Sequence, residues 1–312
     1  MPLSAKVKTA LDETRTLILG AQILLGFQFQ SAFRPRFQEL PAHGMVSLGC
    51  ALGLLLATVG LLIAPSAFHR IAERGASTGR TQVVAGRCAE VALLPFAAAL
   101  GLDLSVALEQ VTGAFTAGWV TGAVSAVLAA AGWFGTGRIM RRNQGAAERR
   151  EAETERDARE AAPLHARIEQ MLTEARVILP GGQALLGFQL AIVLSSAFEK
   201  LPMLSRLIHG VSLLSVALSV ILLITPAALH RIVWSGEDSE DFLRIGGRIT
   251  SAALVPLALG MTGEAYVVFT RISGSWAVGV AAAGVVLLCL LVLWFVWPVV
   301  TRERQRLPVL QG

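Results

Sequence analysis

The sequence predicts an all-α integral membrane protein with eight transmembrane helices, arranged as two parallel four-helix repeats. Hydrophobic residues make up 54% of the 312 residues and charged residues only 16%, and the mean hydropathy is +0.61. A soluble domain carries about 25% charged residues. This composition therefore excludes a soluble globular domain, a disordered chain and a disulfide scaffold. Two further observations, an internal repeat and eight apolar stretches, give the arrangement.

The internal repeat organises the whole chain. Residues of the first half recur 161 positions later, without a gap, over about 130 positions. The matched pairs include rare residue types, such as Gln22 with Gln183, His69 with His230, and Trp133 with Trp294. Chance does not keep one offset across so many rare residues, so the chain is a tandem duplication.

Each copy contains four apolar stretches of about the 20 residues that a helix needs to cross a bilayer. They lie at 16–33, 45–64, 84–102 and 113–136 in the first copy, and at 177–196, 207–225, 247–264 and 276–299 in the second. The first and fifth stretches are interrupted by glutamines, so a steeply tilted or interfacial helix is the alternative for each. Stretches of this length predict helices rather than barrel strands. Pro65 lies where the second stretch ends and is expected either to start a short interfacial helix or to cap the span, and Pro226 is its repeat equivalent.

The distribution of basic residues predicts the orientation. Of the 27 lysine and arginine residues, only five lie in the segments expected outside: Arg34, Arg36, Lys200, Arg206 and Arg271. Because cytoplasmic loops hold the excess of basic residues, both termini are expected inside, in a bacterial cytoplasmic (inner) membrane. Four spans per copy give both copies the same orientation.

Four parts follow from this reading: a membrane repeat at 1–141, a charged cytosolic helical linker at 142–172, a second membrane repeat at 173–302 and a cytosolic tail at 303–312. The linker alternates Glu and Arg at helical spacing between Glu148 and Glu160. This pattern is typical of a solvated connector, and a docking helix for a partner is the alternative.

Polar residues that recur in both copies are the candidate functional positions, because polar groups in lipid are costly and mark functional sites. The set comprises Glu13, Arg15, Gln22, Gln28, His69, Arg70 and Arg87, with Glu174, Arg176, Gln183, Gln189, His230, Arg231 and Arg248. Glu13 and Glu174 are expected to pair with Arg87 and Arg248. His69 is either a proton-sensing group or a histidine at the water–lipid boundary.

Carboxylates limit the transport interpretation. Asp103 and Glu264 are acidic in both copies but lie at the outer ends of the third and seventh stretches, so the signal for a mid-membrane proton relay is weak. No nucleotide-binding, hydrolase or metalloprotease motif occurs, and Cys50, Cys88 and Cys289 form no CxxC pair. We therefore expect no enzyme activity, no cofactor, no metal site and no nucleic-acid partner.

The fourth and eighth stretches carry small residues suited to helix packing. Ala114, Gly118, Gly122 and Ala126 form one ridge, and Ala277, Ala281 and Val285 are expected to form the other. Trp133, Trp294 and Trp297 are expected to anchor these helices at the inner interface.

Each copy also carries Glu-x-Arg, Gly-x-Gln-x-Leu-Leu-Gly-Phe, Phe-x-x-Leu-Pro and Leu-Leu-Ile-x-Pro-x-Ala-x-His-Arg-Ile. These motifs resemble the prokaryotic membrane-protein family known as domain of unknown function 6328. The resemblance covers about 13–141 and 174–302 and implies a four-helix unit, present here twice. Only the second copy has the Leu179-Pro180-Gly181 form typical of the family.

Two functions fit these observations. The first is a carrier or pore for a small ion such as a proton or sodium, with Gln22, Gln183, Arg87 and Arg248 near an inner vestibule. The second is a structural or interaction protein whose inner Arg and His residues hold anionic lipid headgroups. Membrane lipids are the expected partners, and the repeats would form a pseudo-dimer or a homo-oligomer.

Overall fold

The structure is a computed structural model, and it describes residues 3–73, 78–144, 164–235 and 237–306. Within these ranges every regular element is a helix, as the composition predicted. The elements of the first repeat are α1 (Leu3–Ser31), a short 3₁₀ helix η1 (Pro35–Glu39), α2 (Ala42–Ile71), α3 (Gly79–Thr112) and α4 (Phe115–Gln144).

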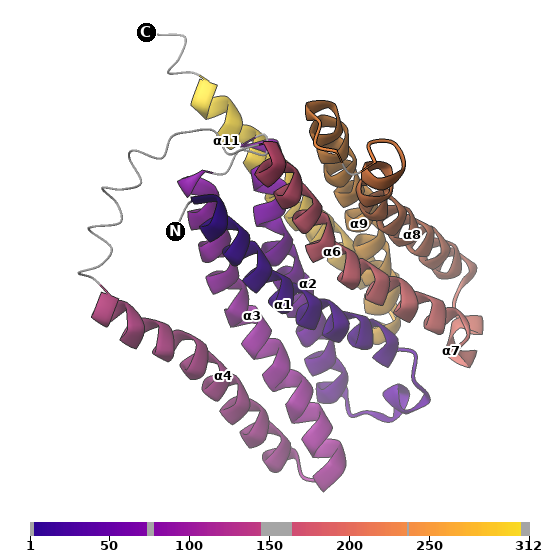
Figure 1. Cartoon of the computed structure of the whole chain (residues 1–312). Coiled ribbons are helices and arrows are strands. Elements are labelled where there is room, and N and C mark those ends of the chain that lie inside the picture. Colours follow the sequence, from indigo (N-terminus) through magenta and orange to yellow (C-terminus); the bar gives the residue numbers. More distant parts are fainter. Residues whose placement is uncertain (1–2, 74–77, 145–163, 236, 307–312) are drawn as a thin grey trace.

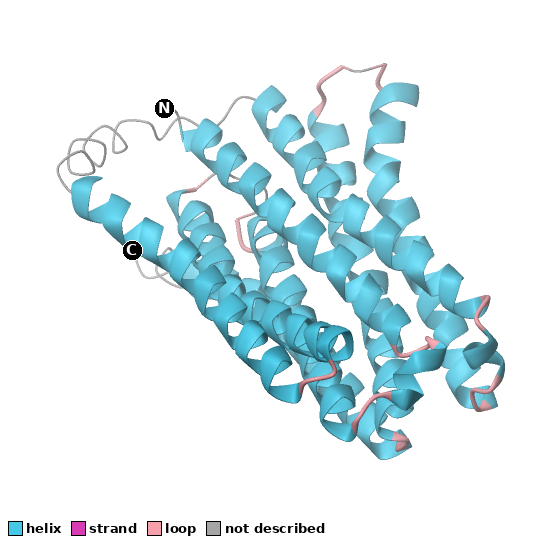
Figure 2. Cartoon of the chain, turned by 90° about the horizontal axis from the view of Figure 1, so that it is seen from below, coloured by secondary structure: helices cyan, strands magenta, loops and turns pink. Residues whose placement is uncertain are grey.

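The second repeat has the same order of elements. They are α6 (Leu164–Val193), a one-turn helix α7 (Ser196–Glu199), α8 (Met203–Ile232), α9 (Glu240–Ser273) and α10 (Trp276–Leu291), followed by a π-helical turn η2 (Val292–Val296) and α11 (Trp297–Arg306). The helices lie side by side, with the loops gathered at the two ends of the bundle (Figure 2).

Seven of the described helices are long and apolar enough to cross a membrane. α2 and α8, at 30 residues each, extend for about 45 Å, which exceeds the ~30 Å hydrocarbon core. The exception is α1, whose apolar part is Leu17–Ser31 although the helix begins at Leu3. A membrane protein is the class of molecule that these helices define.

Proline does not end the second and sixth helices. α2 continues through Pro65 to Ile71, and α8 continues through Pro226 to Ile232. Pro65 therefore neither starts a separate helix nor caps α2, and both alternatives are wrong, because the helix continues for six residues beyond it. α6 begins at Leu164, within the predicted linker 142–172, and linker residues 145–163 lie outside the described residues.

The two repeats meet along α1 and α6, which pack against each other in front of α2 (Figure 1). α2 also packs against α9 and against the continuous α10–η2–α11 segment. α4 instead packs mainly on α3 and stands at the edge of the bundle (Figure 1). The repeats are therefore alike in sequence order but unequal in their surroundings.

Glycines on α2 explain this inequality. Trp294 of η2 is fully buried, and its Nε1 donates a hydrogen bond to the Gly60 carbonyl oxygen at 2.9 Å. The residues equivalent to Gly53 and Gly60 on α8 are Leu214 and Ile221, which are 67% and 61% exposed. A glycine face allows close approach of a neighbouring helix, whereas large apolar side chains face outward into lipid. Trp294 is thus a packing residue, and its prediction as an interfacial anchor is wrong.

The small-residue ridge of the fourth helix packs as predicted. A Cβ built on Gly122 would lie 2.4 Å from the Gly101 carbonyl oxygen of α3, and one on Gly118 would lie 2.5 Å from the Ser105 carbonyl oxygen. The prediction that Ala277, Ala281 and Val285 form the second packing ridge is wrong, because all three residues are exposed. Gly279, the repeat equivalent of Gly118, faces α9 instead.

Candidate functional site

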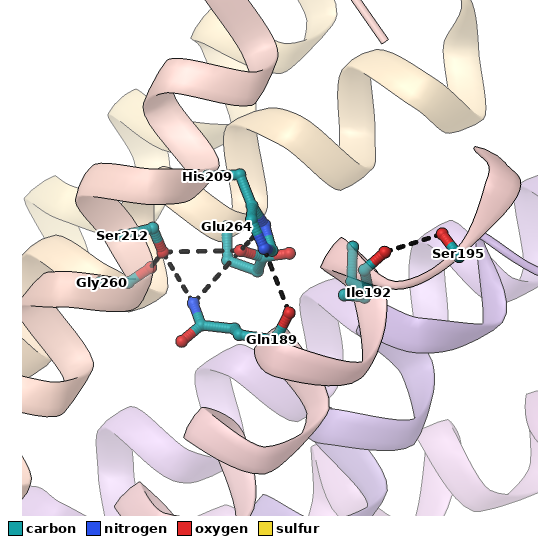
Figure 3. Close-up of polar contacts among 7 residues, drawn as sticks. All are labelled: Gln189, Ile192, Ser195, His209, Ser212, Gly260 and Glu264. Carbon is teal, nitrogen blue, oxygen red and sulfur yellow. Dashed lines mark hydrogen bonds and ion pairs between the residues drawn. The ribbon is translucent and has the colours of Figure 1, made fainter. Parts of the chain in front are cut away.

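A buried polar cluster lies between α6, α8 and α9 of the second repeat, at the end of the bundle that the basic residues predict to lie outside (Figure 3). We call it the outer cluster. Its members are Gln189 from α6, His209 and Ser212 from α8, and Glu264 from α9, and none is more than 2% exposed. Ser195 donates to the Ile192 carbonyl oxygen at 2.8 Å, where α6 ends, and the Phe198 ring lies 5.1 Å from the His209 ring. The turn after α6 therefore covers the cluster on one side.

His209 and Glu264 form the centre of this outer cluster. His209 Nδ1 lies 2.9 Å from Glu264 Oε2, in an ion-pair contact rather than an aligned hydrogen bond. His209 Nε2 lies 3.2 Å from the Gln189 carbonyl oxygen, which can only accept, so Nε2 carries a proton. A second proton must then lie on Nδ1 or on the carboxyl group, because two lone pairs would otherwise face each other. The pair therefore holds one exchangeable proton.

The remaining members orient the carboxyl group. Gln189 Nε2 donates to Ser212 Oγ at 2.8 Å and to Glu264 Oε2 at 3.2 Å, and Ser212 Oγ donates to the Gly260 carbonyl oxygen at 2.5 Å. Glu264 Oε1 and Gln189 Oε1 have no hydrogen-bond partner among the described residues. One oxygen of the buried carboxyl group is thus held in place, and the other is available to a further donor.

The first repeat has a simpler version of this cluster. Gln28 Nε2 donates to Asp103 Oδ1, as Gln189 does to Glu264, but Leu48 and Ala51 occupy the positions of His209 and Ser212. The glutamine–carboxylate pair is therefore common to both repeats. The histidine that can exchange a proton with the carboxyl group belongs to the second repeat alone.

A second buried cluster, which we call the inner cluster, lies between the repeats, towards the opposite end of the bundle. Glu174 of α6 is fully buried and contacts the His69 ring and the Arg70 guanidinium, both from α2. Gln170 Nε2 lies 3.2 Å from His69 Nε2. Because the amide nitrogen donates, His69 Nε2 accepts, and the ring proton on Nδ1 faces Glu174. The prediction that Glu174 pairs with Arg248 is wrong, because Arg70 of the other repeat takes that place.

The predicted pairs are not equivalent in the fold. Gln22 is fully buried against α6, whereas Gln183 is exposed. His69 is buried, whereas His230 stacks on Phe242 with ring centroids 4.6 Å apart. The other arginines of the set, apart from Arg70, are exposed where the structure describes their side chains: Arg87, Arg176, Arg231 and Arg248. The side chains of Glu13 and Arg15 lie outside the described residues, so the expected pairing of Glu13 with Arg87 stays a prediction.

The requirement that a residue recur in both copies concealed part of the site. His209 and Ser212 have apolar equivalents, and Gln170 is equivalent to Thr9, so none of them passed that requirement. A polar residue in only one copy of an apolar helix was the signal that could have found them. Cys50 and Cys289 are exposed and Cys88 is buried, and the described residues contain no group of three metal-binding side chains.

Two tandem units of long apolar helices, with ionisable groups buried between them, define a helical multi-pass membrane protein. A model described as a family of unknown function (DUF6328) matches residues 4–136 and again residues 150–298. The chain belongs to this family and contains its unit twice, as the sequence motifs predicted. No curated protein and no solved structure matches it.

Proposed function

We propose that the protein is a proton carrier of the bacterial cytoplasmic membrane and that Glu264 with His209 is its proton-binding site. The observation that carries the proposal is the contact of these two side chains at 2.9 Å, with both fully buried. An ionisable residue inside a membrane helix is expensive and is a functional site by default. The pair is neutral when it holds its exchangeable proton and charged when it releases it.

The chemistry of the cluster favours a proton over a sodium ion. Sodium and other hard cations are held by cages of oxygen ligands. Here the carboxyl oxygen Oε2 faces an imidazole nitrogen, and the Ser212 hydroxyl donates to a backbone carbonyl rather than pointing its lone pairs to a common centre. A histidine–carboxyl pair is suited to taking up and releasing protons.

The proposed arrangement has eight spans, with α1 as the first and with both termini in the cytoplasm. The bias of basic residues to one side of the helices supports this orientation. The two repeats would occupy the places that two chains occupy in a homodimer of single-unit relatives.

The proposal is tested in proteoliposomes that contain a pH-sensitive dye, with a potassium diffusion potential to drive proton movement. Wild type should change the pH of the liposome lumen when the potential is applied. Glu264→Gln and His209→Leu should each reduce the rate of this pH change at least tenfold. Glu199→Gln is the matched control, because it neutralises an exposed carboxylate at the same end of the bundle. A wild-type rate equal to that of protein-free liposomes would refute the proposal.

An anionic-lipid-binding role is the second candidate, favoured by the exposed Arg176, Arg231 and Arg248, which lie near the ends of their apolar stretches that are expected inside. Each basic residue near an anionic surface contributes about 1 kcal/mol. Replacing all three by Gln should lower the anionic lipid that copurifies with the protein, measured by mass spectrometry. Unchanged lipid content would exclude this role. That result would not bear on the proton-carrier proposal.

A further inference from the structure

Between the two buried clusters, α6 presents a buried face with polar or small residues at intervals. Glu174 lies at its inner part, Gly181 in the middle and Gln189 at its outer part, and all three are buried. At 100° per residue, Gly181 is about 20° and Gln189 about 60° from Glu174, so they share one side of the helix. The 15 residues from Glu174 to Gln189 correspond to about 22 Å along the axis, most of the hydrocarbon thickness.

The Gln22 amide occupies the middle of this face. Its side chain lies directly on Gly181, where a built Cβ would be 1.3 Å from Gln22 Oε1. Gln22 is fully buried, and neither Nε2 nor Oε1 has a hydrogen-bond partner among the described residues. Buried amides in proteins are otherwise hydrogen-bonded, so this donor and this acceptor lack the partners that such groups normally have.

The duplication supplies a contrast within the same chain. Gln183 is the repeat equivalent of Gln22, yet it is exposed, and a Cβ on Gly20, the equivalent of Gly181, would meet nothing within 4 Å. Of the equivalent pair Gln22 and Gln183, only Gln22 is therefore buried, and it lies beside the helix that joins the two clusters.

We propose that Gln22 binds water as the middle station of a single proton path along α6, between the inner cluster at Glu174 and His69 and the outer cluster at Glu264 and His209. This inference rests on the proposed proton-carrier function. A water molecule there donates to Oε1 and accepts from Nε2. It takes up a proton on one side and releases another on the opposite side, so the amide and the water are unchanged after each transfer.

Apolar side chains separate the stations. Ile178 lies between Glu174 and Gly181, and Leu185 between Gly181 and Gln189, and both are buried. The axial separations of seven and eight residues correspond to about 10 Å and 12 Å, well beyond the ~3 Å of a single hydrogen bond. Transfer along α6 therefore requires short water chains on both sides of Gln22, and an apolar residue at Gln22 would break them.

The test compares proton flux of Gln22→Met with that of Gln183→Met, which makes the same change at the exposed equivalent. Gln22→Met should lose at least tenfold in rate, and Gln183→Met should retain the wild-type rate. Gln22→Ser, which keeps a group that binds water, should retain more flux than Gln22→Met. Thermal unfolding in detergent and gel filtration of each variant separate loss of flux from loss of fold.

The outcomes separate this inference from the function on which it rests. If wild type carries protons and Glu264→Gln does not, but folded Gln22→Met carries them at the wild-type rate, the path through Gln22 is refuted and the outer site stands. Equal loss in Gln22→Met and Gln183→Met also refutes it, because burial would then be irrelevant. If Gln22→Met does not fold, a rate in folded Gln22→Ser below one tenth of wild type refutes it, and a higher rate supports it.

Discussion

Replacing Arg70 by methionine should destabilise the protein strongly, because this change leaves a carboxylate buried between the repeats. Glu174 is fully buried, and the Arg70 side chain is only 6% exposed. Removing one partner of a buried ion pair costs about 3–5 kcal/mol. His69 also contacts Glu174 and remains in the variant, so we expect a loss near the lower end, about 3 kcal/mol.

Arg231→Met is the matched control, because Arg231 is the repeat equivalent of Arg70 and is exposed. A surface change of this kind alters stability by about 0.5 kcal/mol or less. The assay is reversible unfolding of the purified protein in mixed micelles, monitored by tryptophan fluorescence. Adding Glu174→Gln to Arg70→Met should recover part of the loss, since no charge is then left unpaired. Equal stability of Arg70→Met and Arg231→Met would refute the inter-repeat ion pair.

Two further changes test the packing between the repeats. Gly181→Ala should destabilise the protein by about 1–3 kcal/mol, because the added Cβ would overlap the Gln22 amide. Gly20→Ala is the control, because its Cβ meets open space and should leave the stability unchanged. Equal unfolding midpoints for the two variants would contradict the contact between Gln22 and Gly181. Trp294→Phe removes the hydrogen bond to the Gly60 carbonyl oxygen and should lower the free energy of unfolding by about 0.5–1.5 kcal/mol. If the neighbouring helices loosen, the emission of the remaining tryptophans should shift to longer wavelength. An unchanged unfolding midpoint would show that the bond contributes nothing.

The sequence was sufficient to predict the helices and the duplication, because hydrophobic length and a constant repeat offset are local properties. It also predicted the packing ridge that contains Gly122, since small residues four apart form a ridge in any helix, although it did not identify α3 as the partner helix. The same reasoning failed for Ala281, where the choice of face depends on the neighbouring helix rather than on the spacing.

The candidate site could be predicted only in part, because equivalence in sequence does not carry over to the environment. Gln22 and Gln183 match in sequence, but only Gln22 lies against a glycine of the facing helix. His209 could not be found from recurrence, since its equivalent is Leu48. The packing of the repeats decides which copy of a polar residue is buried, and no property of a single copy contains that information.

The account depends most on one claim, that the His209–Glu264 pair takes up and releases a proton. Infrared difference spectroscopy of the purified protein across a pH step measures this directly, through the bands of the carboxyl group and of the imidazole ring, since the proton lies on one or the other. The account predicts difference bands that are present in wild type and in Glu199→Gln and absent in Glu264→Gln. Identical difference spectra for wild type and Glu264→Gln would contradict it.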